Sequence, residues 1–183
     1  GAVLFKKSRS HIETVNDLDG NVVNLFEWIK KDPEKLAHEI YYTPYARQVY
    51  EDAFVGISED SLSRAVNFYI RLNMGHGFRT NGEKVGWKND VQGRERAYAA
   101  QYWCDLPKEI IEAAERLRGV QIECRPALEL IQRFNYKKVL IYCDPPYVLH
   151  TRHGEQYRCE MDERGHNDLL DVLLAHKGPV LLS

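Results

Sequence analysis

One short stretch constrains this chain more than any other, because it joins an apolar run to an acid, two prolines and a tyrosine. Residues 139–143 are apolar or weakly polar and include two β-branched side chains, which predicts a buried strand. Asp144, Pro145, Pro146 and Tyr147 follow directly. Because prolines have no backbone N–H, pairing stops there and nearby carbonyls stay free to accept hydrogen bonds. The set suits a planar ring that carries an amino group; a strand with a simple tight turn is the alternative.

These four residues resemble the DPPY motif of the S-adenosylmethionine-dependent DNA adenine-N6 methyltransferases, in particular the Dam-like and phage-type group. Four further segments are similar to parts of that family: residues 1–5 to the end of its glycine-rich cofactor loop, residues 13–19 to its second strand, residues 120–123 to its third, and residues 180–183 to the strand after the catalytic motif. The similarity is weakest between about residues 75 and 93. Because both ends resemble points inside the family fold, we expect a fragment of a longer protein.

The resemblance implies an α/β fold, with a Rossmann-like class I methyltransferase sheet, helices on both its faces and a helical target-recognition insertion. Residues 1–33 and 119–183 would form an incomplete catalytic core. Residues 34–118 would form the insertion, with a DNA target-recognition loop at residues 75–96. The expected ligands are S-adenosyl-L-methionine, as methyl donor, and duplex DNA.

The implied chemistry is direct methyl transfer to the N6 amine of an adenine that has been flipped out of the duplex. Asp144, Pro145, Pro146 and Tyr147 would be the catalytic residues. The Asp144 carboxylate and the Pro145 carbonyl would accept hydrogen bonds from the amine, and Tyr147 would stack on the base. Positioning and electrostatics would then supply most of the catalysis.

Cofactor contacts are expected from Gly1, Asp17, Leu18 and Asp144. Gly1 would be the last glycine of the cofactor loop, where the absence of a side chain lets the backbone approach the ligand. In dinucleotide-binding folds an acid at the tip of the second strand accepts hydrogen bonds from ribose, which favours Asp17 for that role. Either Asp17 or Asp19 also suits a helix cap, and we assign the cap to Asp19.

Two further features of the sequence concern this site. Arg125 and Pro126 stand where family members often have an acid that contacts the cofactor adenine, so the chain departs from the family at this position. His166 matches a family position, but a lone histidine is more often structural than catalytic.

The DNA-binding prediction concerns a stretch without helical or strand periodicity. Residues 75–93 contain five glycines, and long irregular loops in compact domains are usually functional or disordered. The candidate DNA-binding residues in this stretch and just after it are Arg79, Lys84, Trp87, Lys88, Arg94 and Arg96. The cations would meet phosphates and the aromatic ring would stack or wedge. A solvent-exposed loop without DNA contact is the alternative.

Helix boundaries are predicted from capping residues. Asp32-Pro33 should open one helix and Thr43-Pro44 another. Residues 94–103 look helical, and residues 105–107 should cap a separate helix that runs to Arg118. The aromatic segment 41–45 is interpreted as a junction between helices, with DNA contact as the alternative.

Composition indicates which partners and which cellular compartment to expect. The chain of 183 residues has 28% charged residues and a net charge of −2, so no polyanion partner is indicated for the chain as a whole. Cys104, Cys124, Cys143 and Cys159 are widely spaced, which favours buried free thiols over disulfides or a zinc site. We expect a cytoplasmic monomer without a metal and without a membrane-spanning segment.

Three other functions fit part of the pattern. Some RNA guanine-N2 methyltransferases also end the catalytic strand in a DPP-aromatic sequence, but their sheet usually lacks a large helical insertion. Glutamine methyltransferases fit less well because they carry Asn in place of Asp144. A DNA-binding module without activity is the alternative from another class.

Overall fold

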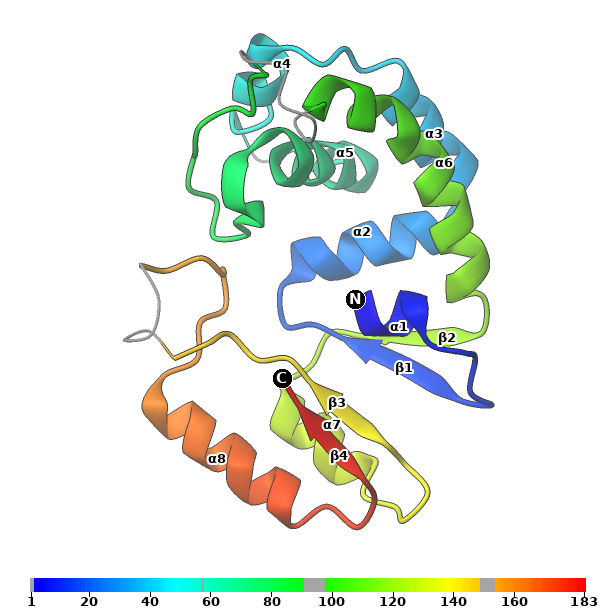
Figure 1. The fold of residues 1–183 in the computed structure, drawn as a ribbon, viewed down its shortest axis with the longest axis vertical. Coiled ribbons are helices and arrows are strands. Elements are labelled where there is room, and N and C mark those ends of the chain that lie inside the picture. The colour runs from blue at the N-terminus through cyan, green and yellow to red at the C-terminus, as the bar shows by residue number, and fades with distance from the viewer. Residues whose placement is uncertain (1, 57, 91–97, 149–153) are drawn as a thin grey trace.

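The computed structural model describes residues 2–56, 58–90, 98–148 and 154–183 (Figure 1). Its helices are α1 (Ala2–Lys6), α2 (Gly20–Lys31), α3 (Pro33–Tyr41), α4 (Arg47–Asp52), α5 (Ser61–Met74), the 3-10 helix η1 (His76–Phe78), α6 (Ala99–Leu117), α7 (Ala127–Arg133) and α8 (Glu163–Leu174). Its strands are β1 (Glu13–Asn16), β2 (Val120–Glu123), β3 (Ile141–Cys143) and β4 (Val180–Leu182). Helices α3 to α6 gather at one end of the molecule, and the strands with α7 and α8 occupy the other (Figure 1).

The strands form two parallel pairs. In one, Glu13 of β1 lies opposite Val120 of β2. In the other, Ile141 of β3 lies opposite Val180 of β4. The α/β class is therefore confirmed, but within the described residues the pairs are separate sheets and not the single sheet that was expected. Strand β3 is also only half-buried, with Tyr142 41% exposed, so the prediction of a buried strand is wrong.

The main hydrophobic core lies among α2, α3, α5 and α6. Its members with the least exposure are Leu36, Ile40, Tyr50, Ala65, Met74, Leu106, Ile110, Leu117 and Val120. Leu25, Trp28 and Ile29 of α2 belong to the same cluster, so this helix packs with those of the expected insertion. A smaller cluster of Ile131, Leu169 and Leu173 joins α7 to α8 and supports β3 and β4. Each fully buried side chain of this kind contributes about 1.5–3 kcal/mol.

Two predicted helix starts are confirmed. Asp19 caps α2, where its carboxylate accepts a hydrogen bond from the Asn21 N–H at 2.9 Å. Asp32 caps α3 and accepts from the Lys35 N–H at 3.1 Å, with Pro33 in the first turn. Such caps contribute about 1 kcal/mol each, because they satisfy backbone donors that lack a partner within the helix.

The predicted helix boundary at residues 105–107 is wrong, because α6 runs unbroken through Pro107. Proline inside a helix removes one backbone hydrogen bond and costs about 3 kcal/mol. Here Trp103, Leu106 and Ile110 form a buried stripe on the same helix, with exposures of 5%, 1% and 1%. Continuing the helix keeps all three in the core, which outweighs the cost of the proline.

Thr43-Pro44 does not open a helix either. The Thr43 hydroxyl donates to the Glu39 carbonyl at 2.7 Å and so closes α3, while α4 begins at Arg47 after an Ala46 cap without a side-chain bond. In the aromatic segment, Tyr45 packs between Trp87 and Trp103, as expected for a junction. Tyr41 and Tyr42 are each 69% exposed, so the junction interpretation is wrong for them.

All four cysteines are free thiols, as predicted, but Cys104 and Cys124 are exposed and not buried. No helix in the described part of the chain is both long enough and apolar enough to span a bilayer. Within the same residues, no group of three or more His, Cys, Asp or Glu side chains is arranged to bind a metal ion.

Candidate active site at the carboxyl ends of the strands

The Asp144 to Tyr147 motif begins directly after β3, where the strand reaches its carboxyl end. The Ser183 N–H donates to the Cys143 carbonyl at 2.9 Å, so the end of β4 holds the residue before the motif. The Asp144 side chain is exposed, and Tyr147 is 57% exposed. The supported backbone thus presents the acid and the aromatic ring to solvent, where a ligand can reach both.

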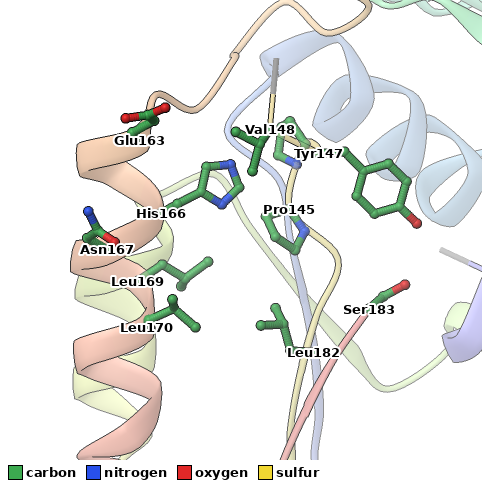
Figure 2. A pocket seen from close by; sticks show the side chains of 11 residues that line it. Pro145, Tyr147, Val148, Glu163, His166, Asn167, Leu169, Leu170, Leu182 and Ser183 are labelled. Atoms are coloured by element: carbon green, nitrogen blue, oxygen red, sulfur yellow. The ribbon is translucent and has the colours of Figure 1, made fainter. Parts of the chain in front are cut away.

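A cavity of about 420 Å³ lies against the motif (Figure 2). The motif side of its wall is made by Pro145, Pro146, Tyr147 and Val148. The facing residues, from α8 and the end of β4, are Glu163, His166, Asn167, Leu169, Leu170, Leu182 and Ser183. The volume falls within the range of about 300–1,000 Å³ that is usual for small-molecule sites. Asp144 is not among the described residues that line it, so the carboxylate lies on another side of the motif.

His166 is placed in the wall of this cavity, with its ring directed from α8 toward the motif (Figure 2). Its Nε2 atom is shielded from solvent and makes no hydrogen bond with any described residue. A buried polar atom without a partner costs about 1–3 kcal/mol. The sequence favoured a structural role for His166. In the structure its Nε2 atom lies in the wall of the cavity beside the motif and has no hydrogen-bond partner among the described residues.

Asp17 follows β1, at the carboxyl end of the other strand pair. One of its carboxylate oxygens accepts a hydrogen bond from the Asp19 N–H at 2.9 Å, and its own N–H donates to the Glu123 carbonyl at 3.3 Å. Although the side chain reaches solvent, the surrounding protein partly desolvates the carboxyl group and raises its pKa, an effect to which the Asp19 charge adds. The other oxygen makes no hydrogen bond within the described residues and is available to a ligand hydroxyl. Leu18, 51% exposed, lies next to it.

Asn16 is a supporting residue that the sequence reasoning missed. Its amide nitrogen donates to the Arg125 carbonyl at 2.9 Å, and its amide oxygen accepts from the Arg125 N–H at 3.0 Å. This reciprocal pair joins the tips of β1 and β2 and holds the backbone that carries Asp17. The Arg125 guanidinium pairs with Glu123, with Nε of the arginine 3.4 Å from Oε2 of the carboxylate. The sequence signal that could have indicated this role is the position of Asn16 directly before Asp17 at the end of a strand.

The cations of the predicted DNA-binding loop already have partners in the described structure. Arg79 pairs with Glu83, and Lys84 lies 3.3 Å from Glu51. Lys84 is half exposed, and such surface pairs are worth about 0–1 kcal/mol, so they can be exchanged for phosphate contacts at little cost. Arg94 and Arg96 lie outside the described residues.

Lys88 and Trp87 are held more firmly. The Lys88 ammonium donates to the Asn73 carbonyl at 2.9 Å and lies 4.5 Å from the centre of the Phe78 ring, and burial lowers its pKa. Trp87 packs 5.4 Å from the Tyr45 ring, under the Arg47 guanidinium. Both side chains therefore brace the loop against the helices.

Comparison with known families decides the reaction class. A family model described as D12 class N6 adenine-specific DNA methyltransferase matches residues 1–178. The chain belongs to this family. No curated protein matched it. The protein is therefore an adenine-specific DNA methyltransferase, and neither RNA guanine-N2 methylation nor DNA binding without activity is supported.

Proposed function

We propose that this D12-class enzyme transfers a methyl group from S-adenosyl-L-methionine to the N6 amine of an adenine flipped out of duplex DNA, with Asp144, Pro145, Pro146 and Tyr147 as its catalytic residues. The observation that carries the proposal is the position of these residues directly after β3, with the acid and the ring both open to solvent. Ligands in α/β folds bind outside the carboxyl ends of the strands, which is where the motif lies.

Asp144 and the Pro145 carbonyl act on the adenine amine. The N6 lone pair is delocalised into the ring, so the amine is a weak nucleophile. Two acceptors that bind its hydrogens favour a more tetrahedral nitrogen with its lone pair directed at the methyl group. The bound cofactor supplies an electrophilic methyl group, and the chain contributes orientation and electrostatic stabilisation.

Tyr147 captures the flipped base. Removing adenine from the duplex costs a few kcal/mol. Stacking of a base on an aromatic ring is worth about 1–3 kcal/mol, so the exposed Tyr147 ring offsets much of that cost.

Asp17, Leu18 and Asp144 form the described part of the proposed cofactor site. The available Asp17 oxygen fits a ribose hydroxyl, and the exposed Leu18 side chain fits the adenine face. Asn16 would keep Asp17 in place through its paired bonds to Arg125. Gly1, the remaining proposed contact, lies outside the described residues.

The proposal extends to the architecture. The β1–β2 and β3–β4 pairs, which are not hydrogen-bonded to each other within the described residues, would lie in one Rossmann-like layer, and the parallel pairing within each pair supports this. Residues 34–118 would serve as the target-recognition insertion, with Arg79, Lys84, Trp87, Lys88, Arg94 and Arg96 toward DNA. The enzyme would act as a cytoplasmic monomer, and the four free thiols are compatible with a reducing compartment.

Replacing Arg79 and Lys84 with glutamine should weaken DNA binding and flatten its dependence on salt. Each phosphate contact contributes about −0.9 to the slope of log K against log salt, so the double variant should lose up to about 1.8. Binding titrations at several salt concentrations measure this slope. Lys108→Gln, which alters an 81% exposed lysine outside the loop, is the matched control. A slope unchanged in the double variant would show that these cations do not contact phosphate.

The proposed reaction is tested by following labelled methyl from S-adenosylmethionine into unmethylated duplex DNA and, in parallel, into RNA. Nuclease digestion and mass spectrometry then identify the modified base. We expect N6-methyladenine in the DNA. Label confined to RNA guanine, or no transfer to either substrate, would overturn the proposal.

A further inference from the structure

Residues 154–160, here called the connecting segment, lie between the catalytic motif and α8 in the sequence and contact the recognition loop in space (Figure 1). The Gln156 carbonyl accepts hydrogen bonds from the N–H groups of Thr80 and Asn81, at 2.9 and 3.4 Å. The Asn81 side-chain amide donates to the Glu155 carbonyl at 3.0 Å. In the other direction, the Arg158 N–H donates to the Thr80 hydroxyl at 3.3 Å.

The connecting segment has an ordered backbone of its own. Glu160 accepts hydrogen bonds from the N–H groups of Gln156 and Tyr157, at 2.8 and 2.9 Å. These bonds fix a turn whose carbonyls point at the recognition loop. The contact with Thr80 and Asn81 is therefore made between two preformed backbones.

The same segment also reaches the proposed cofactor side. Arg158 Nη1 lies 3.9 Å from Oδ1 of Asp19, whose side chain is 4% exposed. Asp19 caps α2, and its backbone N–H donates the hydrogen bond that orients the Asp17 carboxylate. One short piece of chain thus touches the recognition loop and the cofactor-side turn, and it continues into the α8 wall of the cavity beside the motif.

We propose that Thr80 and Asn81 are positioning residues that couple the recognition loop to the catalytic motif. The inference rests on the proposed function. When the loop engages DNA, its hold on residues 155–158 sets the position of the segment that leads into α8, and so of the α8 wall that lies against the motif across the cavity. This favours the arrangement of motif and wall that captures the base. Recognition of the correct sequence would then raise the rate of transfer as well as the affinity.

The alternative is that these hydrogen bonds only stabilise the fold. The two ideas differ in what they do to specificity. Loss of a purely structural contact lowers stability and reduces activity on all DNA by the same factor. Loss of a coupling contact reduces kcat on the preferred sequence more than on other sequences, while cofactor affinity stays unchanged.

Two near-isosteric variants test this in the intact protein. Thr80→Val removes the hydroxyl that accepts from the Arg158 N–H, and Thr80→Ser should restore it. Asn81→Asp removes the donor to Glu155 but keeps the oxygen that accepts from the Glu83 N–H. Thr14→Val is the matched control, because it removes one hydroxyl bond, to Gln121, at the other end of the molecule.

We expect kcat on preferred DNA to fall about fivefold to tenfold in Thr80→Val and Asn81→Asp, the effect of one or two lost hydrogen bonds. The ratio of kcat/KM between preferred and other sequences should shrink, and 2-aminopurine at the target position should show less base flipping. An unchanged ratio, whether kcat stays the same or falls by the same factor on all DNA, would overturn the inference while wild-type methylation stands. Absence of methylation by the wild type would instead overturn the proposed function.

Discussion

Replacing Asp144 with alanine should abolish methyl transfer and leave the fold intact. The side chain is exposed, and its removal breaks no hydrogen bond or ion pair among the residues that the structure describes. In the proposed reaction, the variant lacks the carboxylate that accepts a hydrogen bond from the adenine amine. Removing one such electrostatic group typically costs about 10²–10³ in kcat.

Methyl transfer to duplex DNA under single-turnover conditions measures this loss directly. Asp144→Asn is the sharper variant, because it keeps the shape of the side chain and removes the charge. Asp168→Ala changes another exposed acid, on α8, and should retain wild-type activity. Thermal unfolding should be the same for all three variants. Substantial residual transfer by Asp144→Ala would exclude the role assigned to this carboxylate.

Several features that depend only on neighbouring residues were predicted correctly from the sequence. The Asp19 and Asp32 caps follow from side chains that satisfy backbone donors one turn away, and both are where they were expected. The motif was also placed correctly after a strand, because two consecutive prolines cannot extend a ladder. Each of these features depends on a few neighbouring residues and needs no knowledge of what packs against them.

Features that depend on distant partners were predicted poorly. Pro107 signals a helix end by itself, and only the buried Trp103, Leu106 and Ile110 explain why α6 continues. The reciprocal amide bonds of Asn16 connect residues more than a hundred positions apart, which no local pattern reveals.

A partly buried ion cluster at the start of β1 leads to the second large expected effect. Glu13→Gln should destabilise the protein by about 2 kcal/mol, because a hydrogen bond between charged groups contributes about 1.5–3 kcal/mol. The Glu13 side chain is 7% exposed and accepts two hydrogen bonds from the Arg116 guanidinium, at 2.7 and 2.9 Å. Lys7 pairs with it as well. The cluster ties β1 to α6 and to the segment after α1, so the variant should also weaken cofactor binding through Asp17.

The destabilisation should depend on pH, because the Arg116 hydrogen bonds, with help from Lys7, lower the pKa of Glu13 from 4.5 to about 2. A carboxyl group whose pKa is lower in the folded state stabilises that state fully above its unfolded pKa, and this contribution is lost as the pH falls toward the folded value. The gap between wild type and Glu13→Gln should therefore be full above about pH 5 and shrink steadily as the pH approaches 2. Urea unfolding across this range measures it, with Glu115→Gln, which breaks an exposed pair with Arg118, as the control. A gap of constant size would show that the loss comes from packing and not from the charge.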